Sequence, residues 1–300
     1  MGADLAHEFP VARRIFEEAD EALGFALSRL CFEGPEEDLR LTANTQPATL
    51  ATSIAALRAF ESESSITPEL AAGHSLGEYS ALVAAGALTL GAALRAVRER
   101  GRLMQEACPP GRGAMAALIG LDLAAVRELC AEASTGGEIA VAANLNAPGQ
   151  IVISGNAGAV RRALQAAKGR GAGASVELKV SAPFHCPLMQ PARDGMEAVL
   201  ERLAIGPLKF GVIANVNAEV NREAARVKPL LLEQITGSVL WEQSMTTLAA
   251  ADIIETIEFG AGRILAGLMR RINRNLKVRA AEDSASLRAT IQALAADAGK

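Results

Sequence analysis

Residues 69–88 read ELAAGHSLGEYSALVAAGAL, and this stretch decides the fold that the rest of the chain must accommodate. A short apolar run is followed by a turn and then by small and apolar residues with helical spacing. The turn contains Gly73-His74-Ser75-Leu76-Gly77, a G-x-S-x-G sequence between a predicted strand and a predicted helix. This order predicts an α/β fold in which Ser75 lies at a sharp, strained bend, as a nucleophilic serine does.

Ser75 has a second interpretation. Glu78 follows it by three residues, and Ser-x-x-Glu is the pattern of a capping box, in which the serine would only start the helix. Glycine at positions 73 and 77 favours the first interpretation, because a residue without a Cβ atom lets a strand and a helix approach closely. The local sequence leaves both interpretations open.

A nucleophilic serine needs a base, and histidine is the usual base near neutral pH. The chain has three histidines. His74 is adjacent to Ser75, so its side chain is expected to point away from the hydroxyl, and His7 lies close to the start of the chain. His185 remains, in the segment SAPFHCP of residues 181–187. We therefore predict His185 as the base if Ser75 is a nucleophile; otherwise a structural or exposed histidine is the alternative.

Arg100 lies on an apolar helix face. Ala93, Val97, Arg100 and Met104 follow each other at spacings of four, three and four residues, whereas the nearby arginines at 95, 98 and 102 share the opposite face and are expected to be solvated. A buried guanidinium needs an anionic partner, because desolvating it unpaired is costly. The partner is either an internal Asp or Glu or the carboxylate of a substrate.

The pattern of predicted elements changes along the chain. Between residues 113 and 181 the order is strand, helix, strand, strand, helix, strand, in AMAALIGL, DLAAVRELCAEA, EIAVAANL, QIVISG, AGAVRRALQAAKGRG and ASVELKV. This βαββαβ order predicts a ferredoxin-like unit with two helices on one face of a four-stranded antiparallel sheet. We expect a large α/β domain from residues 1–110 and 183–300, with residues 111–182 inserted into it. The alanine-rich tail after Ala280 is expected to be a solvated end.

Composition excludes several functional classes. With 50% apolar residues over 300 positions, the chain can bury a core without disulfides. Its four cysteines form no Cys-x-x-Cys pair, so we predict no metal site and a reducing cytoplasm. A net charge of -4 with 3% aromatic residues argues against nucleic-acid binding. The first residues do not resemble a signal peptide and no long apolar stretch occurs, so we expect no membrane association.

Several motifs occur in one order along the chain: GHSLGEYSALVAAGAL, ERGRLMQEA, NLNAPGQIVISG and SAPFHCPLM. Together they resemble the malonyl-CoA:acyl carrier protein transacylases of fatty acid synthesis and the related acyltransferase domains of polyketide synthases, over about residues 1–280. The resemblance implies a hydrolase-like α/β core with a mostly parallel sheet and an inserted ferredoxin-like (βαββαβ) subdomain.

The resemblance also implies roles for the matching residues. Ser75 would be the acylated nucleophile, His185 the general base and Arg100 the group that holds the free malonyl carboxylate. The family orients its histidine with a backbone carbonyl, which matches Gln234, and uses the Leu76 N–H as an oxyanion donor. The residues expected to line the substrate pocket are His74, Met104, Gln150 and Phe184, of which Phe184 resembles the malonyl-selecting residue.

The reaction implied by the resemblance is a ping-pong transfer. Malonyl-CoA would acylate Ser75, and the phosphopantetheine thiol of acyl carrier protein would then take the malonyl group. The partners are therefore a coenzyme A thioester and the carrier protein, and no permanently bound cofactor is expected. Because carrier proteins are acidic, we predict a basic docking patch, for which the densest basic run is Arg270, Arg271, Arg274, Lys277 and Arg279. An ordinary solvated helix end is the alternative.

The chain departs from the family at its start. Relatives usually begin with an apolar strand and a loop of the type F-P-G-Q-G-S-Q, and this chain starts just after that point. We expect the N-terminal strand and a second oxyanion donor to be missing through a truncated or wrongly assigned start; losing one such donor costs about 3 kcal/mol. The rival functions are a trans-acting polyketide acyltransferase, an acyl hydrolase, and a carrier-binding module without a working oxyanion hole.

Overall fold

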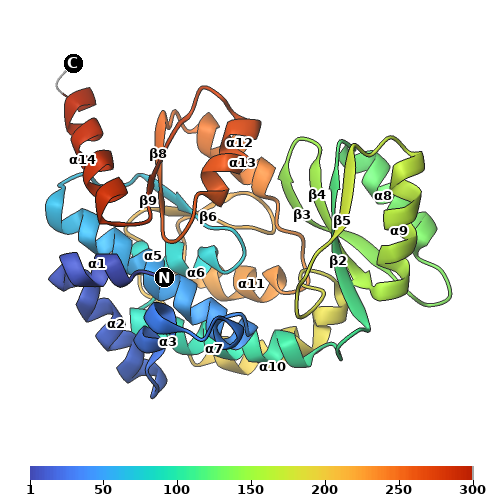
Figure 1. Ribbon diagram of the computed structural model, residues 1–300, viewed down its shortest axis with the longest axis horizontal. Coiled ribbons are helices and arrows are strands. Elements are labelled where there is room, and N and C mark those ends of the chain that lie inside the picture. The colour runs from blue at the N-terminus through green and yellow to red at the C-terminus, as the bar shows by residue number, and fades with distance from the viewer. Residues whose placement is uncertain (299–300) are drawn as a thin grey trace.

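The computed structural model describes residues 1–298, and its N-terminal part is a layer of helices around one short strand (Figure 1). The elements are α1 (Ala3–Glu8), α2 (Pro10–Leu23), α3 (Leu27–Glu33), α4 (Glu36–Leu39), α5 (Thr42–Glu63), β1 (Leu70–Ala72), α6 (Gly77–Ala84) and α7 (Leu90–Glu106). Helices α5 and α7 pack closely because Gly101 has no side chain: a Cβ atom there would lie 2.5 Å from the Thr42 main-chain oxygen. This close packing brings the buried face of α7 against α5.

Residues 113–177 form a separate four-stranded sheet, on the right in Figure 1. Its elements are β2 (Gly113–Ile119), α8 (Leu123–Ala133), β3 (Ala140–Ala147), β4 (Gln150–Asn156), α9 (Ala157–Gly169) and β5 (Ala174–Glu177). The strand order is β3-β4-β2-β5 and all pairs are antiparallel. Alternate residues of β2 face opposite sides: Ala116 and Leu118 pack under α8 and α9, and Met115 faces away from them. The predicted ferredoxin-like arrangement is confirmed.

The chain then returns to the first part of the molecule. The remaining elements are the 3-10 helix η1 (Pro187–Met189), α10 (Gln190–Glu201), β6 (Gly211–Ile213), β7 (Val220–Asn221), α11 (Ala224–Gln234), α12 (Trp241–Ala250), β8 (Glu255–Phe259), α13 (Ile264–Ile272), β9 (Lys277–Ala281) and α14 (Ser284–Ala298). Strand β6 pairs parallel with β1 and antiparallel with β7, and β8 pairs parallel with β9. The α/β fold class is confirmed, with parallel pairing in both of these small sheets.

The expectation of a solvated tail after Ala280 is wrong. Ala281 ends β9, and α14 follows with Leu287 fully buried against the large core. Asp283 starts this helix, since its carboxylate accepts a hydrogen bond from the Ser286 N–H at 2.7 Å. A high alanine content favours helix, and the apolar residues spaced along α14 give it a face to bury.

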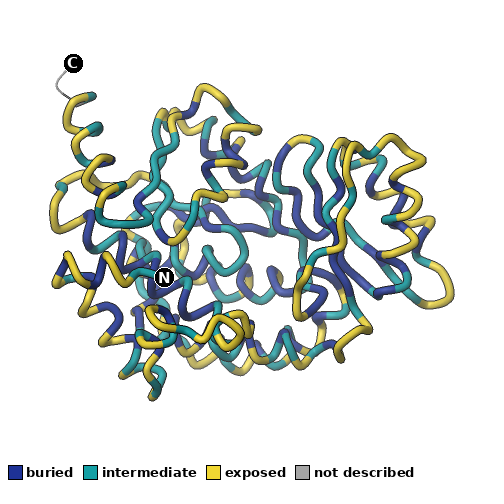
Figure 2. The backbone as a smooth tube through the Cα atoms, viewed as in Figure 1, coloured by how far each residue is buried: buried dark blue, intermediate teal, exposed yellow. Residues whose placement is uncertain are grey.

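The large and small parts contact each other at several places. A Cβ atom on Gly113 would overlap the ring of Pro183, so the outgoing and returning chains cross side by side. In β3, Leu145 N–H donates to the Val239 carbonyl at 2.9 Å, and Val239 N–H donates to the Ala143 carbonyl at 2.8 Å. Figure 2 shows buried backbone running through the middle of the large part and along the small sheet. His185, two residues after Pro183, therefore lies beside the junction.

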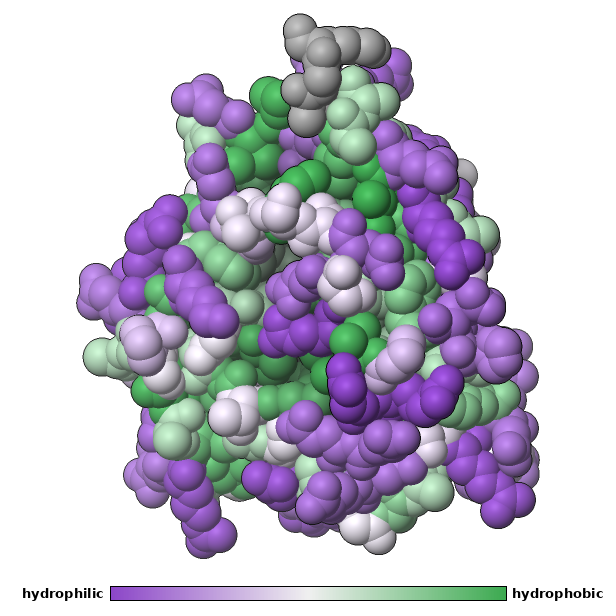
Figure 3. Space-filling view, turned by 90° about the vertical axis from the view of Figure 1, so that its left-hand side faces the viewer, coloured by the Kyte–Doolittle hydropathy of each residue, from purple (hydrophilic) through white to green (hydrophobic). Residues whose placement is uncertain are grey.

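The face of the large part that lies opposite the small sheet is mainly polar. Seen from the end opposite the small sheet, hydrophilic side chains surround smaller areas of hydrophobic ones (Figure 3). Within residues 1–298, none of the helices combines the length and the apolar character that crossing a bilayer requires.

Candidate active site

Ser75 lies at a sharp bend between β1 and α6. Its φ angle is 52°, a left-handed value that a residue with a side chain rarely adopts. Gly73 makes the bend possible, because a Cβ atom there would overlap the main chain of Gly77. At Gly77 itself a Cβ atom would meet nothing within 4 Å, so the space argument from the sequence holds at Gly73 and is wrong at Gly77.

Side chains from two other elements hold the bend. The Ser75 N–H donates to Asn215 Oδ1 at 2.6 Å, and Asn215 Nδ2 donates to the Gly73 carbonyl at 2.8 Å. Gln234 Nε2 donates to the Ser75 carbonyl at 2.9 Å. The sequence did not reveal Asn215. It is the second residue after β6, whose carboxyl end lies beside that of β1 because the two strands are parallel.

The capping-box interpretation is wrong. Glu78 does not bond the Ser75 N–H; its Oε2 atom accepts hydrogen bonds from the Asn215 N–H at 3.1 Å and from Gln234 Nε2 at 2.7 Å. The residue that precedes α6 is Leu76, and it makes no side-chain cap. The Ser75 hydroxyl is therefore available for other contacts.

His185 contacts this hydroxyl. Its Nε2 atom lies 2.7 Å from Ser75 Oγ, and its Nδ1 atom lies 2.9 Å from the Gln234 carbonyl oxygen. Because that carbonyl can only accept, Nδ1 carries the proton and Nε2 accepts from the serine. Burial, together with the charge of Arg100, lowers the pKa of His185 to about 3, which keeps the imidazole neutral. His185 also has a positive φ of 58°, so both contacting residues have strained backbones.

Arg100 completes the contacts around Ser75 Oγ. Its Nη2 atom donates to Ser75 Oγ at 3.0 Å and to Gln234 Oε1 at 2.8 Å, and its Nη1 atom donates to Gln46 Oε1 at 2.8 Å. The helix face predicted to be apolar is buried, with Arg100 itself 2% exposed. No carboxylate of the described residues forms a hydrogen bond with the guanidinium, and its Nε atom has no partner there. Neutral groups thus hold a buried positive charge.

Leu76 presents a free backbone donor. It lies at the start of α6, where the first N–H groups of a helix have no partner within the helix. Within residues 1–298 the structure shows no hydrogen bond from the Leu76 N–H. A backbone N–H group beside a reacting serine, at the positive end of a helix, is suited to stabilise an oxyanion.

Two further predicted pocket residues, Met104 and Phe184, pack near Arg100 and His185. Met104 is buried and accepts a weak contact from Gln46 Nε2, so it shares the Arg100 environment. Phe184 is half-buried and packs between the large core and the outer face of the small sheet. Both residues therefore belong to the surroundings of His185 and Arg100.

His74 and Gln150 connect the large part to the small sheet. The His74 side chain forms no hydrogen bond with Ser75, and its Nε2 atom lies 2.8 Å from Asn146 Oδ1. Gln150 accepts a hydrogen bond from Arg271 on α13, and no hydrogen bond joins it to the serine, the histidine or Arg100. Both contacts cross between the two parts of the molecule.

The predicted basic patch is smaller than its sequence suggests. Arg279 is ion-paired with Glu255 and Asp297, and Lys277 is ion-paired with Asp297. Arg270 and Arg274 are exposed. Local charge density could not show this, because the acidic partners are distant in sequence.

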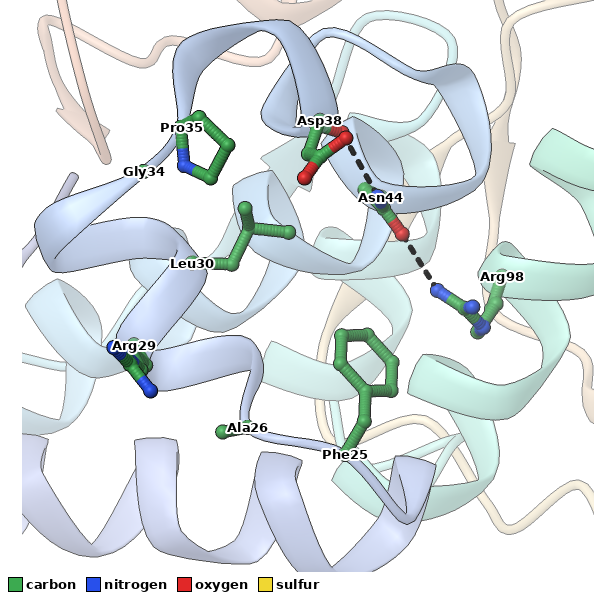
Figure 4. Close-up of a pocket in the computed structure, with 9 residues that line it drawn as sticks. All are labelled: Phe25, Ala26, Arg29, Leu30, Gly34, Pro35, Asp38, Asn44 and Arg98. Carbon is green, nitrogen blue, oxygen red and sulfur yellow. Dashed lines mark hydrogen bonds between the residues drawn. The ribbon is translucent and has the colours of Figure 1, made fainter.

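A hollow of about 330 Å³ on the other side of α7 is not this site (Figure 4). Its lining includes Arg98, which donates to Asn44 Oδ1 at 2.7 Å and lies over the Phe25 ring at 4.4 Å. Arg98 was expected to be solvated, and these contacts make it half-buried. Arg98 and Arg100 point to opposite sides of the helix, so only the second reaches Ser75.

The fold and these contacts define a class of protein: α/β enzymes that use a serine at a strand–helix bend with a histidine base for acyl chemistry. Consistent with this class, the family model described as acyl transferase domain matches residues 1–258. The chain belongs to this acyl transferase family.

Named relatives match almost the whole chain. The malonyl CoA-acyl carrier protein transacylase of Bacillus subtilis (strain 168) is 47% identical over 294 residues, which are 98% of this chain and 92% of that protein. The solved transacylase of Coxiella burnetii superposes with a TM-score of 0.95 at 39% identity, covering 97% of this chain and 92% of that one. A malonyl-transacylase in complex with a type II PKS acyl-carrier protein superposes with a TM-score of 0.94 at 42% identity, covering 97% and 94%.

Among residues 1–298 there is no group of three or more His, Cys, Asp or Glu side chains that could hold a metal ion. The four cysteines are free and buried.

Proposed function

We propose that this protein transfers malonyl from malonyl-CoA to the phosphopantetheine thiol of acyl carrier protein through an ester on Ser75. The observation that carries the proposal is the buried guanidinium of Arg100, which lies 3.0 Å from Ser75 Oγ and bonds no carboxylate of residues 1–298. Such a group next to a nucleophile fits a substrate with a free carboxylate close to its reacting carbonyl. The named relatives are transacylases of this kind.

In the first half-reaction, Ser75 attacks the thioester carbonyl while His185 Nε2 takes the hydroxyl proton. The Gln234 carbonyl holds the Nδ1–H tautomer that leaves Nε2 free to accept. The Leu76 N–H donates to the developing oxyanion. The tetrahedral intermediate collapses, the proton passes from His185 to the leaving thiolate, and coenzyme A departs.

In the second half-reaction, the thiol of the carrier attacks the malonyl ester. His185 now takes the thiol proton, and collapse of the second intermediate returns a proton to Ser75 Oγ. Water must be kept from the ester for transfer to exceed hydrolysis. The site lies at the junction between the large part and the small sheet. We propose that this junction keeps water from the ester.

The position of Arg100 sets the length of the preferred acyl group. In malonyl a single methylene separates the carboxylate from the carbonyl that Ser75 attacks, and the guanidinium contacts the serine oxygen directly. A succinyl carboxylate is one carbon further from its carbonyl, and an acetyl group has no carboxylate. The position of Arg100 therefore favours malonyl over both of these acyl groups.

We assign Met104, Phe184, His74 and Gln150 to the walls of the substrate site.

We further propose a large domain of residues 1–110 and 183–300 and a small domain of residues 111–182. The separate hydrophobic cluster under α8 and α9 supports this division. The four free cysteines support a protein of the reducing cytoplasm, and the proposed reaction itself requires no permanently bound cofactor.

Carrier acylation tests the proposal. Malonyl-CoA and holo-carrier should yield malonyl-carrier and coenzyme A with the wild type and none with Ser75→Ala. Without carrier, coenzyme A release should stop after one equivalent, because the malonyl ester is stable to water. Continued release without carrier would show a hydrolase, and carrier binding without any acyl transfer would show a docking module.

A further inference from the structure

Glu78 is a buried carboxyl that the mechanism above does not use. It lies three residues after Ser75 in the first turn of α6 and is 3% exposed. Its Oε2 atom accepts both of its hydrogen bonds, from the Asn215 N–H at 3.1 Å and from Gln234 Nε2 at 2.7 Å. No Lys or Arg of the described residues forms an ion pair with it within 4.0 Å. A buried carboxyl without a direct cation is unusual and calls for an explanation.

The amide of Gln234 connects this carboxyl to Arg100. Gln234 Nε2 donates to Glu78, and Gln234 Oε1 accepts from Arg100 Nη2 at 2.8 Å. One side chain therefore separates the acid from the guanidinium, and their charges interact. The other titratable group that interacts with Glu78 is the buried Tyr79 phenol of α6 itself. Helix α11 and the segment after β6 present the amides of Gln234 and Asn215 to it.

We propose that Glu78 is the counter-charge of Arg100 in the empty site and takes up a proton when a malonyl carboxylate binds to Arg100. This inference rests on the proposed function, since it requires a substrate carboxylate on Arg100. Glu78 is a positioning residue here, because it acts through Gln234 and Arg100 without touching the substrate.

Charge balance in the buried site supports the proposal. The empty site holds one guanidinium and one carboxyl, so ionised Glu78 compensates Arg100. A bound malonyl carboxylate adds a second anion beside a single cation, and two buried carboxylates close together cannot both stay ionised at low cost. Burial raises the pKa of Glu78 to about 7 even in the empty site, so a second anion moves the acid to its neutral form near physiological pH.

The hydrogen bonds allow this protonation without rearrangement. Both donors bond Oε2, and Oε1 has no hydrogen-bond partner among residues 1–298. The proton can therefore add to Oε1 while Oε2 keeps its contacts with Asn215 and Gln234. One proton from solvent forms one O–H bond, and no other bond changes. With Glu78 either ionised or protonated, the main-chain carbonyl of Gln234 therefore still accepts from His185, and its side-chain Oε1 still accepts from Arg100.

Titration calorimetry in buffers of different ionisation enthalpy measures the proton uptake. Binding is followed in a Ser75→Ala background, which prevents acylation, with malonyl-CoA and with acetyl-CoA as the ligand without a carboxylate. With malonyl-CoA we expect uptake of about half a proton at pH 7, approaching one at about pH 8. With acetyl-CoA we expect none. Above pH 7 the affinity for malonyl-CoA should fall up to about tenfold per pH unit.

Two variants test whether Glu78 is the group that takes up the proton. Glu78→Gln in the same background should abolish the uptake and make malonyl-CoA affinity independent of pH between 7 and 8. Glu242→Gln removes another carboxyl whose pKa burial raises but which forms no hydrogen bond with Gln234, Asn215 or Arg100, and it should leave the uptake unchanged. Equal uptake with and without Glu78, or none in the parent, overturns the inference.

The two proposals fail separately. If the wild type forms malonyl-Ser75 while the titration shows no proton uptake, Glu78 does not have this role and the transfer function stands. If no malonyl-Ser75 forms, both fall. Should Glu78→Gln not fold, as judged by circular dichroism, infrared difference spectra of the parent decide. A protonated carboxyl band should appear with malonyl-CoA and not with acetyl-CoA, and its absence overturns the inference.

Discussion

The Ser75 hydroxyl has two neighbours that act on it differently. The neutral imidazole of His185 can remove its proton, and the guanidinium of Arg100 can hold the substrate carboxylate one methylene from the carbonyl under attack. Among residues 1–298, the amide oxygens of Gln46 and Gln234 contact the guanidinium directly and no carboxylate does, so it remains able to bond a substrate carboxylate. At the scale of single residues, we therefore propose that selectivity and activation come from adjacent groups.

Arg100→Ala should affect malonyl far more than acetyl transfer. Removing one partner of a buried, hydrogen-bonded charge pair costs about 2–5 kcal/mol, which corresponds to a fall in kcat/KM for malonyl-CoA of about thirty- to several thousand-fold. The slow reaction with acetyl-CoA should change much less. Arg102→Ala is the matched control, since Arg102 lies on the exposed face and pairs with Glu99 and Glu106. Equal losses for both substrates would show that Arg100 does not hold a carboxylate.

His185 should make the fold less stable in acid. Its folded pKa of about 3 lies below the ordinary value of 6.5, so the unfolded chain binds a proton that the folded chain does not. The free energy of unfolding therefore falls as pH decreases from 6.5, by about 1.4 kcal/mol per pH unit from this residue. Urea unfolding at pH 6.5 and pH 5 measures it. His185→Asn should lose less stability over this interval than the wild type, and an equal loss would contradict the assignment.

At the scale of elements, the bend between β1 and α6 depends on how two strands and a helix meet. Strand β6 lies parallel to β1, which brings Asn215 to the carboxyl end where Ser75 turns. Helix α6 then starts at Gly77, two residues after the serine, which leaves the Leu76 N–H at the start of the helix. The strained φ of Ser75 is held by these neighbours and not by its own sequence.

Gly73 and Gly77 should respond differently to the same substitution. Gly73→Ala places a methyl group onto the Gly77 main chain, so we expect a loss of unfolding free energy of roughly 1–3 kcal/mol and displacement of the serine. Gly77→Ala meets open space in a helix and should be neutral or stabilising by up to about 1 kcal/mol. Thermal unfolding of both variants tests this, and equal destabilisation would contradict the close contact.

The sequence predicted the elements with local patterns and missed the contacts between distant ones. Alternating residues in the inserted unit were enough for its six elements, and helical spacing was enough to bury Arg100. Asn215, Gln46 and Glu78 were missed because their partners lie far away in the chain or, for Glu78, because a local capping pattern gave a competing explanation. Pairing of β1 with β6 joins residues about 140 positions apart, which periodicity cannot show.

At the scale of the whole molecule, the site lies where the inserted unit joins the large part. Ser75 and Arg100 come from before the insertion, His185 and Gln234 from after it, and His74 contacts Asn146 within it. A carrier protein must reach this junction with its phosphopantetheine arm. Arg270 and Arg274 on and after α13 are exposed and lie near Arg271, which bonds Gln150 across the junction.

Charge reversal of Arg270 and Arg274 should weaken the reaction with carrier only. We expect the KM for acyl carrier protein to rise several-fold, because acidic partners are attracted by this charge, and the effect should shrink at high salt. Acylation of Ser75 by malonyl-CoA should be unchanged. Arg14→Glu on the exposed side of α2 is the control. An unchanged KM would exclude this surface from docking.

Intact mass after brief exposure to malonyl-CoA tests the central claim most directly. We predict that the wild type gains one malonyl group, that peptide mapping places it on Ser75, and that holo-carrier removes it. Ser75→Ala should gain none, and Arg100→Ala should gain it far more slowly. A wild type that gains no malonyl group, or gains it on another residue, would contradict the account.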